Sequence, residues 1–248
     1  MIVVTIIAVL IALLLPSISG TISAARGFRC QSSQRTIAFD FTVFADDALH
    51  GSRGQDEIDL RRGYFRLETF QDSLYQVDEF WAYGSGSTHD LPDAQGRDPM
   101  RCPEVRGTLK LRKNSPCTLN GVGPQENVSF GFNIRMHHSE RYAAAGKPPS
   151  IGLTHRILEG NSTAHPASIP LSLDVDGVAA KSKGVSPLLT GPSLPGSTLF
   201  SGDRYWFPGA RHNGALNVAF IDGHVESSRK PLSEAGWAWD FDAGEPVR

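Results

Sequence analysis

Residues 2–15 read IVVTIIAVLIALLL, and this stretch decides the architecture we expect for the chain. Thirteen of its fourteen residues are apolar, and no charged residue occurs before Arg26. The uncharged run of residues 2–25 would be about 36 Å long as an α-helix. The hydrocarbon core of a bilayer is about 30 Å thick, so the run predicts one membrane-spanning helix that carries a soluble domain.

Two other interpretations of this run are weaker. A cleaved signal peptide begins with basic residues, and none precedes this run, although Ser23-Ala24-Ala25 could serve as a cleavage site. A half-exposed helix of a soluble domain is apolar along one stripe, whereas this run is apolar all round. A retained membrane helix therefore explains it best. By the positive-inside rule, Arg26, Arg29 and Arg35 after the span would place the following domain in the cytoplasm.

The composition of the whole chain limits the classes of protein to consider. The 248 residues carry a net charge of −2 with a pI near 6.4 and form no basic stripe, so we expect no nucleic-acid partner. The 25 glycines and 16 prolines, with few helical patterns after residue 50, predict a loop-rich and β-rich domain. We expect residues 1–28 to be the transmembrane segment, 29–50 a helical stem and 51–248 a β-rich globular domain.

The three cysteines are Cys30, Cys102 and Cys117. Cys102 and Cys117 could close a small disulfide loop if the domain lies outside the cytoplasm. Two free, buried thiols are an equal alternative. Cys30 is left over near the membrane and does not by itself indicate a metal site.

The helix should continue beyond the membrane as an amphipathic stem to about Leu49. Pro16 removes a backbone hydrogen bond within the span, so we expect a membrane-helix kink there. Apolar residues recur in the stem at helical spacing and should pack under the domain: Ile37, Phe41, Phe44 and Ala48. After a turn at 51–54, the patterns predict a strand at 64–70, a helix at 72–83, a loop at 84–99, and strands at 107–111, 127–134 and 169–175.

Near the C-terminus, residues 212–228 predict a β-hairpin. Leu216, Val218 and Phe220 stand at alternate positions, so they should face the buried side of a sheet. Asp222-Gly223 is typical of a two-residue type I′ turn, in which both residues have positive φ, and residues 224–227 would form the return strand. We expect His212 to act locally, by hydrogen-bonding to backbone near the entry of the first strand.

The N-terminal segment IIAVLIALLLPSISGTISAARGFRCQSS resembles that of type IV pilin-like proteins, the pseudopilins. The matching positions are Ala8, Leu13, Leu14, Leu15, Pro16, Ala25, Arg26 and Cys30. Members of this family begin with a short basic leader, a glycine cleavage site and an acidic residue, whereas this chain begins inside the apolar run. Such a leader holds the N-terminus in the cytoplasm, so its absence here would account for the reversed charge rule.

A second motif resembles the same family. His212, Asp222 and Gly223 match the His, nine residues, Asp-Gly pattern of the prepilin-type H-X9-DG group, and residues 129–133 (SFGFN) resemble its Ser-Tyr-Gly-Asn stretch. The resemblance implies an α+β, pilin-like fold with a long N-terminal helix packed on an antiparallel β-sheet domain. It also implies a non-catalytic structural subunit of a type II secretion or type IV pilus-like assembly. That subunit would cross a bacterial inner membrane once, with a periplasmic or extracellular C-terminal domain. Its partners would be membrane lipid and other pilin-like subunits, contacted through the N-terminal helix.

Two other functions remain open. One is a secreted carbohydrate- or ligand-binding β-sandwich with a signal peptide, and the other is a hydrolase that uses His212. Ten residues of straight strand would separate His212 from Asp222 by about 33 Å, which argues against a catalytic pair. Residues 174–177 (DVDG) are similar to the start of a calcium loop, but they lack the third ligand and the closing glutamate. We therefore expect no catalytic residue, cofactor or metal.

Overall fold

The structure is a computed structural model that describes residues 2–45, 101–105, 111–113, 122–124, 128–137, 139–140, 144, 157, 160 and 162–242. Several expectations lie outside the described residues. These are the turn at 51–54, the strand at 64–70, the helix at 72–83, the loop at 84–99 and the environment of Cys117.

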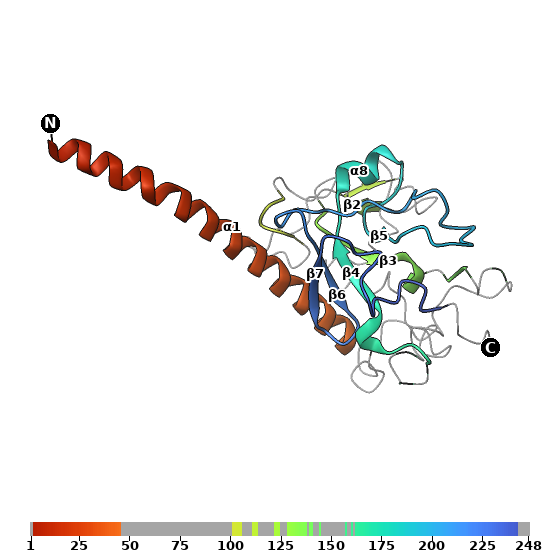
Figure 1. Ribbon diagram of the computed structural model, residues 1–248. Helices are drawn as coiled ribbons and strands as arrows, with labels where there is room; N and C mark the ends of the chain where they lie inside the picture. The colour runs from red at the N-terminus through yellow and green to blue at the C-terminus, as the bar shows by residue number, and fades with distance from the viewer. Residues whose placement is uncertain are drawn as a thin grey trace.

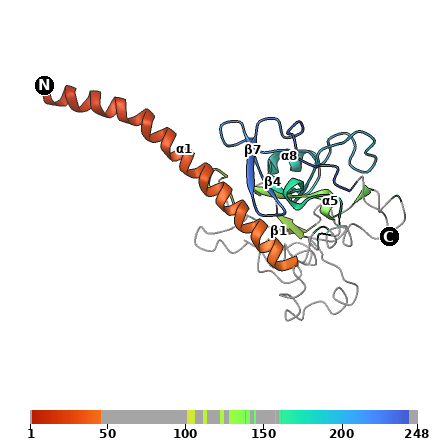
Figure 2. The same cartoon turned by 60° about the horizontal axis from the view of Figure 1, so that its bottom comes forward.

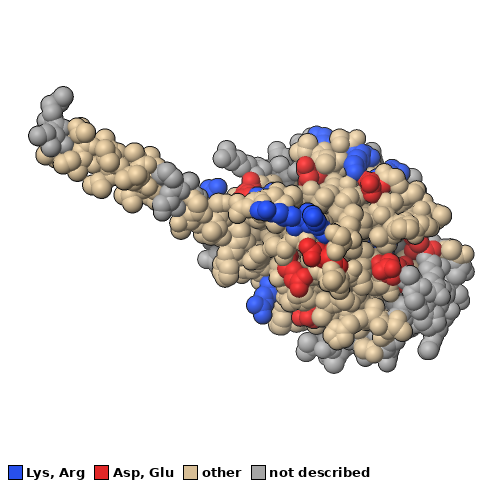
Figure 3. Space-filling view, viewed as in Figure 1, with Lys and Arg blue, Asp and Glu red and all other residues tan. Residues whose placement is uncertain are grey.

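The helix α1, Ile2–Ala45, runs unbroken through Pro16 and projects from the globular domain (Figure 1). Its apolar N-terminal residues are exposed, with Val3 at 68% and Leu13 at 70%. Figure 3 shows this projecting rod without a charged side chain on the visible face until it approaches the domain. Among the helices in the described part of the chain, α1 alone is long and apolar enough to cross a membrane, a criterion that an N-terminal signal sequence also meets. The kink expected at Pro16 stays a prediction.

The C-terminal part of α1 packs on the domain through one stripe of buried side chains. The stripe has the three- and four-residue spacing of a helix face: Cys30, Gln34, Ile37, Ala38 and Phe41. It confirms the expected burial of Ile37 and Phe41, and extends the stripe by about two turns toward the N-terminus, through Gln34 and Cys30. The side chain of Phe44 and the whole of Ala48 lie outside the described residues.

The stem lies against a five-stranded sheet with the order β5-β3-β4-β6-β7 (Figures 1 and 2). Its strands are β3 Phe130–Asn133, β4 Pro170–Asp174, β5 Leu189–Thr190, β6 Leu216–Phe220 and β7 Val225–Ser228. A separate two-stranded sheet pairs β1 Leu111–Lys113 with β2 Val122–Pro124. Short helices are α5 Ile134–His137, η1 Pro166–Ser168 and α8 Gly177–Ser182.

The expected antiparallel sheet is wrong in one detail, because the five-stranded sheet is mixed. Strand β5 pairs with β3 in parallel, and the other pairs are antiparallel. After β4, the chain passes through α8 and returns on the far side of β3. The close approach there depends on Gly131, because a Cβ at that position would lie 2.6 Å from the carbonyl oxygen of Pro187. The expected strands at 127–134 and 169–175 are confirmed, with shorter bounds.

Strand β6 is buried on both faces. The Asn217 side chain faces α1, where Gln31 Nε2 donates to its Oδ1 at 3.4 Å. Phe220 packs on the opposite layer, with its ring 5.3 Å from that of Trp237 in an edge-on arrangement. Leu216, Val218 and Phe220 are buried as expected, and Asn217 and Ala219 are buried too because α1 covers their face.

The turn of the predicted hairpin differs from the expected type. Gly223 N donates to Phe220 O at 3.0 Å, and Phe220 N donates to His224 O at 3.0 Å, so the loop has three residues, 221–223. Gly223 has φ +92°, while Asp222 does not have positive φ. This is a three-residue hairpin loop with glycine at the left-handed position. Asp222 instead accepts a hydrogen bond from His224 N at 3.2 Å, which stabilises the loop without a left-handed aspartate.

Replacing Gly223 by valine should lower the free energy of unfolding by about 1–3 kcal/mol, because a β-branched residue is strained at this positive φ. A Cβ at Gly223 would have no atom within 4 Å, so the loss of stability would report the strain of the backbone and not a packing clash. Denaturant unfolding of the full chain in detergent, followed by tryptophan fluorescence, measures it. Gly223→Asn is the matched control and should cost less, because asparagine tolerates this region. Equal costs for the two variants would contradict the assignment of strain.

Candidate functional site

His212 is placed by a tight turn that precedes β6. Asn213 and Gly214 have φ of 55° and 76°, and Ala215 N donates to His212 O at 3.0 Å. Positive φ at both central residues is the signature of a type I′ turn, for which Asn-Gly is the preferred sequence. The chain therefore reverses just after His212, and the ring is directed inward with its side chain only 9% exposed.

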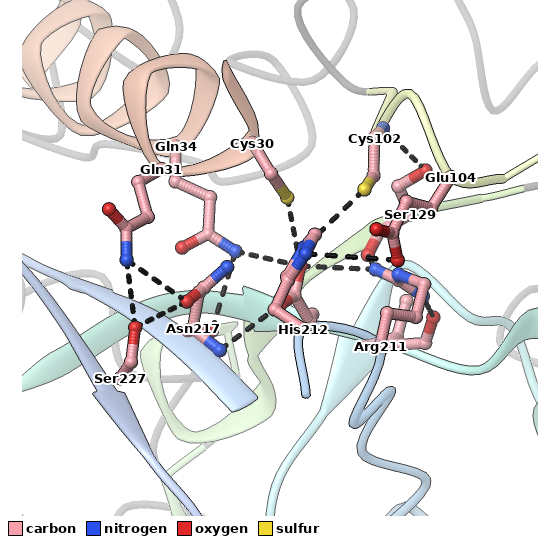
Figure 4. A network of polar contacts seen from close by, with 12 residues as sticks. Cys30, Gln31, Gln34, Cys102, Glu104, Ser129, Arg211, His212, Asn217 and Ser227 are labelled. Carbon is pink, nitrogen blue, oxygen red and sulfur yellow. Dashed lines mark hydrogen bonds and ion pairs between the residues drawn. The ribbon is translucent and has the colours of Figure 1, made fainter. Parts of the chain in front are cut away.

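The ring of His212 meets two cysteines from distant parts of the chain (Figure 4). Its Nε2 lies 3.5 Å from Cys102 Sγ, and one ligand atom each from Cys30, Cys102 and His212 lie within 4.8 Å of one another. Cys30 comes from α1 and Cys102 from the segment 101–105, where its backbone N donates to Ser129 Oγ at 2.8 Å. Both thiols are buried and free. We call these three residues the Cys–Cys–His cluster.

A buried carboxylate adjoins the Cys–Cys–His cluster at the end of β4. Asp174 is fully buried, and its Oδ1 lies 3.4 Å from Cys30 Sγ, while its Oδ2 lies 3.8 Å from His212 Nε2. Arg211 Nη2 forms an ion pair with Asp174 Oδ1 at 3.0 Å. Asp174 also accepts from Gln34 Nε2 at 3.1 Å and from Asn217 N at 3.0 Å. The carboxylate thus links α1, β4 and β6.

Arg211 holds this arrangement to the backbone as well. Its Nη1 donates to Val175 O at 2.5 Å, and its Nη2 donates to Ser129 O at 2.7 Å. A guanidinium can satisfy several acceptors at once because its donors form a fixed planar fork. Arg211 therefore neutralises Asp174 and fixes the loops on either side of it.

The electrostatics of the site favour a shared negative charge. Burial raises the pKa of Asp174 to about 6, although Arg211, the Asn217 N–H and His212 oppose this shift. Hydrogen bonding from Cys30 lowers the pKa of the Cys102 thiol against the effect of burial, and His212 and Arg211 contribute further. Hydrogen bonding with Cys102 raises the pKa of His212, with the nearby carboxylates adding to the shift against the effect of burial. The lowered pKa of Cys102 and the raised pKa of His212 favour a thiolate at Cys102 beside a cationic His212.

Polar contacts continue from the site to β7. Gln31 Nε2 donates to Ser227 Oγ at 2.9 Å, and Ser227 Oγ donates to Asn217 Oδ1 at 2.5 Å. Gln34 Nε2 also reaches Asn217 O at 3.3 Å. The stem is thus joined to the sheet by specific hydrogen bonds in addition to its apolar stripe (Figure 4).

The structure separates the residues of the H-X9-DG motif. His212 lies in the buried site, whereas Asp222 lies at the exposed hairpin tip, where its Oδ1 is 2.5 Å from His224 Nδ1. The expectation that His212 bonds to local backbone through its ring is wrong, because its ring faces Cys102 and Asp174. His212 Nε2 lies 3.8 Å from Asp174 Oδ2, which exceeds a hydrogen bond, and the His212 side chain is 9% exposed.

Two of the cysteines meet in the site. Cys102 is a free, buried thiol beside Cys30 and His212, which agrees with the alternative of free, buried thiols. Cys117 lies outside the described residues, so its pairing with Cys102 stays a prediction. Cys30 is not left over at the membrane, because α1 carries it into the domain. The supposed calcium-loop residues have other roles: Asp174 pairs with Arg211, and Asp176 caps α8 by accepting from Val178 N at 2.9 Å.

Asp174, Arg211, Gln34 and Asn217 were not among the expected site residues. One local signal could have indicated the inward turn: Asn213-Gly214 is the preferred type I′ dipeptide, and it directly follows His212. Comparison of the chain with family models, with curated proteins and with solved structures found no match in any of the three.

Proposed function

We propose that the protein is a pilin-like, membrane-anchored structural subunit. Its N-terminal helix would pack with lipid and with the helices of other subunits of a type II secretion or type IV pilus-like assembly. The single observation that supports this most directly is the division of α1 into two halves. Its N-terminal half is an exposed apolar rod, and its C-terminal half is docked on a sheet.

An exposed apolar rod needs another apolar surface. Monomeric soluble proteins rarely expose contiguous apolar patches above a few hundred Å². The exposed large side chains between Val3 and Leu15 are all those of valine, isoleucine or leucine. Lipid tails or the equivalent helices of other subunits would supply the missing contacts.

The docking of the stem makes the rod a rigid extension of the domain. Buried Ile37 and Phe41, together with the hydrogen bonds of Gln31 and Gln34, hold α1 to β4, β6 and β7. In a subunit built in this way, the position of the membrane helix would determine the position of the outer domain. This suits an assembly whose subunits pack through their helices.

Deleting residues 1–27 should move the protein from the membrane fraction to the soluble fraction, because it removes the whole uncharged run. The measurement is fractionation of cells that express the full-length chain or the deletion variant, followed by carbonate extraction. The full-length chain should resist extraction. Recovery of a soluble chain cut near Ala25 would contradict the anchor and support the signal-peptide alternative.

The assembly part of the proposal is tested separately by cross-linking between copies. A cysteine introduced by Leu13→Cys, in a background with Cys117→Ser, should give dimers on mild oxidation in membranes. The matched control is Ser201→Cys on an exposed loop of the domain, which should give few. Monomers from both variants would contradict packing through the helix while leaving the anchor intact.

A further inference from the structure

We propose that the Cys–Cys–His cluster, with Asp174 as the fourth ligand, binds one zinc ion. The inference rests on the geometry of these four side chains, and it holds whether or not the protein assembles as a pilin-like subunit. The ion would join the stem helix to the sheet domain, so its role would be structural.

Two of the distances between candidate ligand atoms match a tetrahedral site, and the three ligand atoms of the Cys–Cys–His cluster lie within 4.8 Å of one another. Zinc lies about 2.3 Å from thiolate sulfur and about 2.0 Å from imidazole nitrogen, which places sulfur and nitrogen about 3.5 Å apart at tetrahedral angles. The Cys102 Sγ to His212 Nε2 distance is 3.5 Å. Sulfur and carboxylate oxygen should likewise be about 3.5 Å apart. Cys30 Sγ lies 3.4 Å from Asp174 Oδ1.

Asp174 would have to move for one of its oxygens to coordinate. Its Oδ1 is the oxygen near Cys30, whereas its Oδ2 lies 3.8 Å from His212 Nε2, and nitrogen and oxygen on a tetrahedral zinc would be about 3.3 Å apart. Two sulfurs, one imidazole nitrogen and one oxygen form a ligand set that suits zinc better than the hard cations magnesium and calcium, which prefer oxygen.

The charges in the site are balanced by a divalent cation. Two thiolates and the Asp174 carboxylate would contribute three negative charges, and the Arg211 guanidinium one positive charge. A zinc ion would make the sum zero, which removes the penalty for burying unpaired charge. Arg211 would neutralise the carboxylate at Oδ1, which its Nη2 contacts at 3.0 Å, and Figure 4 shows Arg211 beside Ser129.

The second nitrogen of the histidine has a suitable partner for a ligand role. His212 Nδ1 is buried without a hydrogen-bond partner and lies 3.8 Å from Glu104 Oε2. Metal-bound histidines donate their other ring N–H to a carboxylate, which fixes the tautomer that leaves Nε2 free to coordinate. A small shift of Glu104 would complete this pattern, and Glu104 follows Cys102 by two residues on the same turn.

A disulfide between Cys30 and Cys102 is the competing use of the two sulfurs. It would employ only those two atoms and would leave the buried His212 and Asp174 pointing at a bond that needs neither of them. Zinc uses all four groups. It would also join three segments that are 72 and 110 residues apart in the chain, at positions 30, 102 and 212, so that the stem could not leave the sheet without losing the ion.

The test uses the full chain, purified in detergent with a reductant that does not bind metals. Elemental analysis after desalting should find about one zinc per chain. Replacement by Co²⁺ should give the visible bands of a tetrahedral ion and a near-ultraviolet thiolate-to-cobalt charge-transfer band. The Co²⁺ spectrum of the unmodified protein needs no variant, so it tests the ligands even if a variant fails to fold.

Variants identify the ligands. Cys30→Ser and His212→Ala should abolish stoichiometric zinc, and Glu104→Gln should weaken its affinity by about 10-fold through the histidine. The matched controls are Cys117→Ser and His224→Ala, which remove the same residue types elsewhere and should retain one zinc. The proposal is overturned if Co²⁺ gives no charge-transfer band. It is also overturned if the ligand variants bind as much zinc as the controls. Mass spectrometry of unreduced protein from cells that shows a Cys30–Cys102 or Cys102–Cys117 disulfide overturns it as well.

Discussion

Replacing Phe220 by alanine should lower the free energy of unfolding by about 3–5 kcal/mol, the usual cost of removing a fully buried aromatic ring. The ring is 1% exposed at the end of β6, which lies between β4 and β7. It stacks on His224 with the ring centroids 4.2 Å apart, and it meets Trp237 edge-on. Its loss would leave a cavity between the sheet and the C-terminal layer.

Denaturant unfolding of the full chain in detergent, followed by tryptophan fluorescence, measures this change. Leu232→Ala is the matched control, because that side chain is 55% exposed and its truncation should change stability by less than about 0.5 kcal/mol. A Phe220→Ala variant as stable as this control would show that the hairpin does not carry the packing assigned to it.

The features that could be predicted from the sequence are those with a local pattern. The apolar run of residues 2–15 indicates the long helix, because helix length and hydropathy need no tertiary information. Alternation in residues 216–220 likewise indicates β6, and its buried positions follow from period two. The stem stripe at Ile37 and Phe41 follows from the helical period.

Turn geometry was less predictable because two dipeptides compete for the same turn type. Asp222-Gly223 and Asn213-Gly214 both fit type I′. In the register of β6 with β7, Ala219 pairs with Val225 and Phe220 lies opposite His224. Three residues, 221–223, are left between the strands, so the hairpin has a three-residue loop. The I′ turn lies instead at Asn213-Gly214, where it directs His212 inward.

The site itself could not be predicted from residue spacing. Cysteines at 30 and 102 and a histidine at 212 have no short spacing typical of metal ligands, and each comes from a different element. Their meeting depends on how the stem lies across β4 and β6, which is a tertiary property. Asp174 is equally hidden, because its DVDG segment is similar to the start of a calcium loop and nothing in the sequence places it beside Cys30 and His212.

Replacing Arg211 by alanine should lower the free energy of unfolding by about 3–5 kcal/mol, because removal of one member of a buried ion pair leaves the other charge uncompensated. Asp174 is fully buried. Two described residues with a basic side chain, Arg211 and His212, lie within ion-pair distance of it, and of these only Arg211 is always charged. The variant also removes the donors that satisfy the carbonyl oxygens of Val175 and Ser129. The measurement is denaturant unfolding with a chelator present, so that bound metal does not contribute.

A double variant separates the ion pair from the other contacts of Arg211. If the charge left on Asp174 dominates the cost, then Arg211→Ala combined with Asp174→Asn should be less destabilised than the sum of the single variants, by at least about 1 kcal/mol. Arg204→Ala is the matched control for loss of an exposed arginine, and it should change stability by less than about 0.5 kcal/mol. Additive single costs would instead assign the effect to the backbone carbonyls. An Arg211→Ala variant as stable as Arg204→Ala would contradict this prediction, because protonation of Asp174 or its hydrogen bonds from Gln34 and Asn217 would then suffice without the guanidinium.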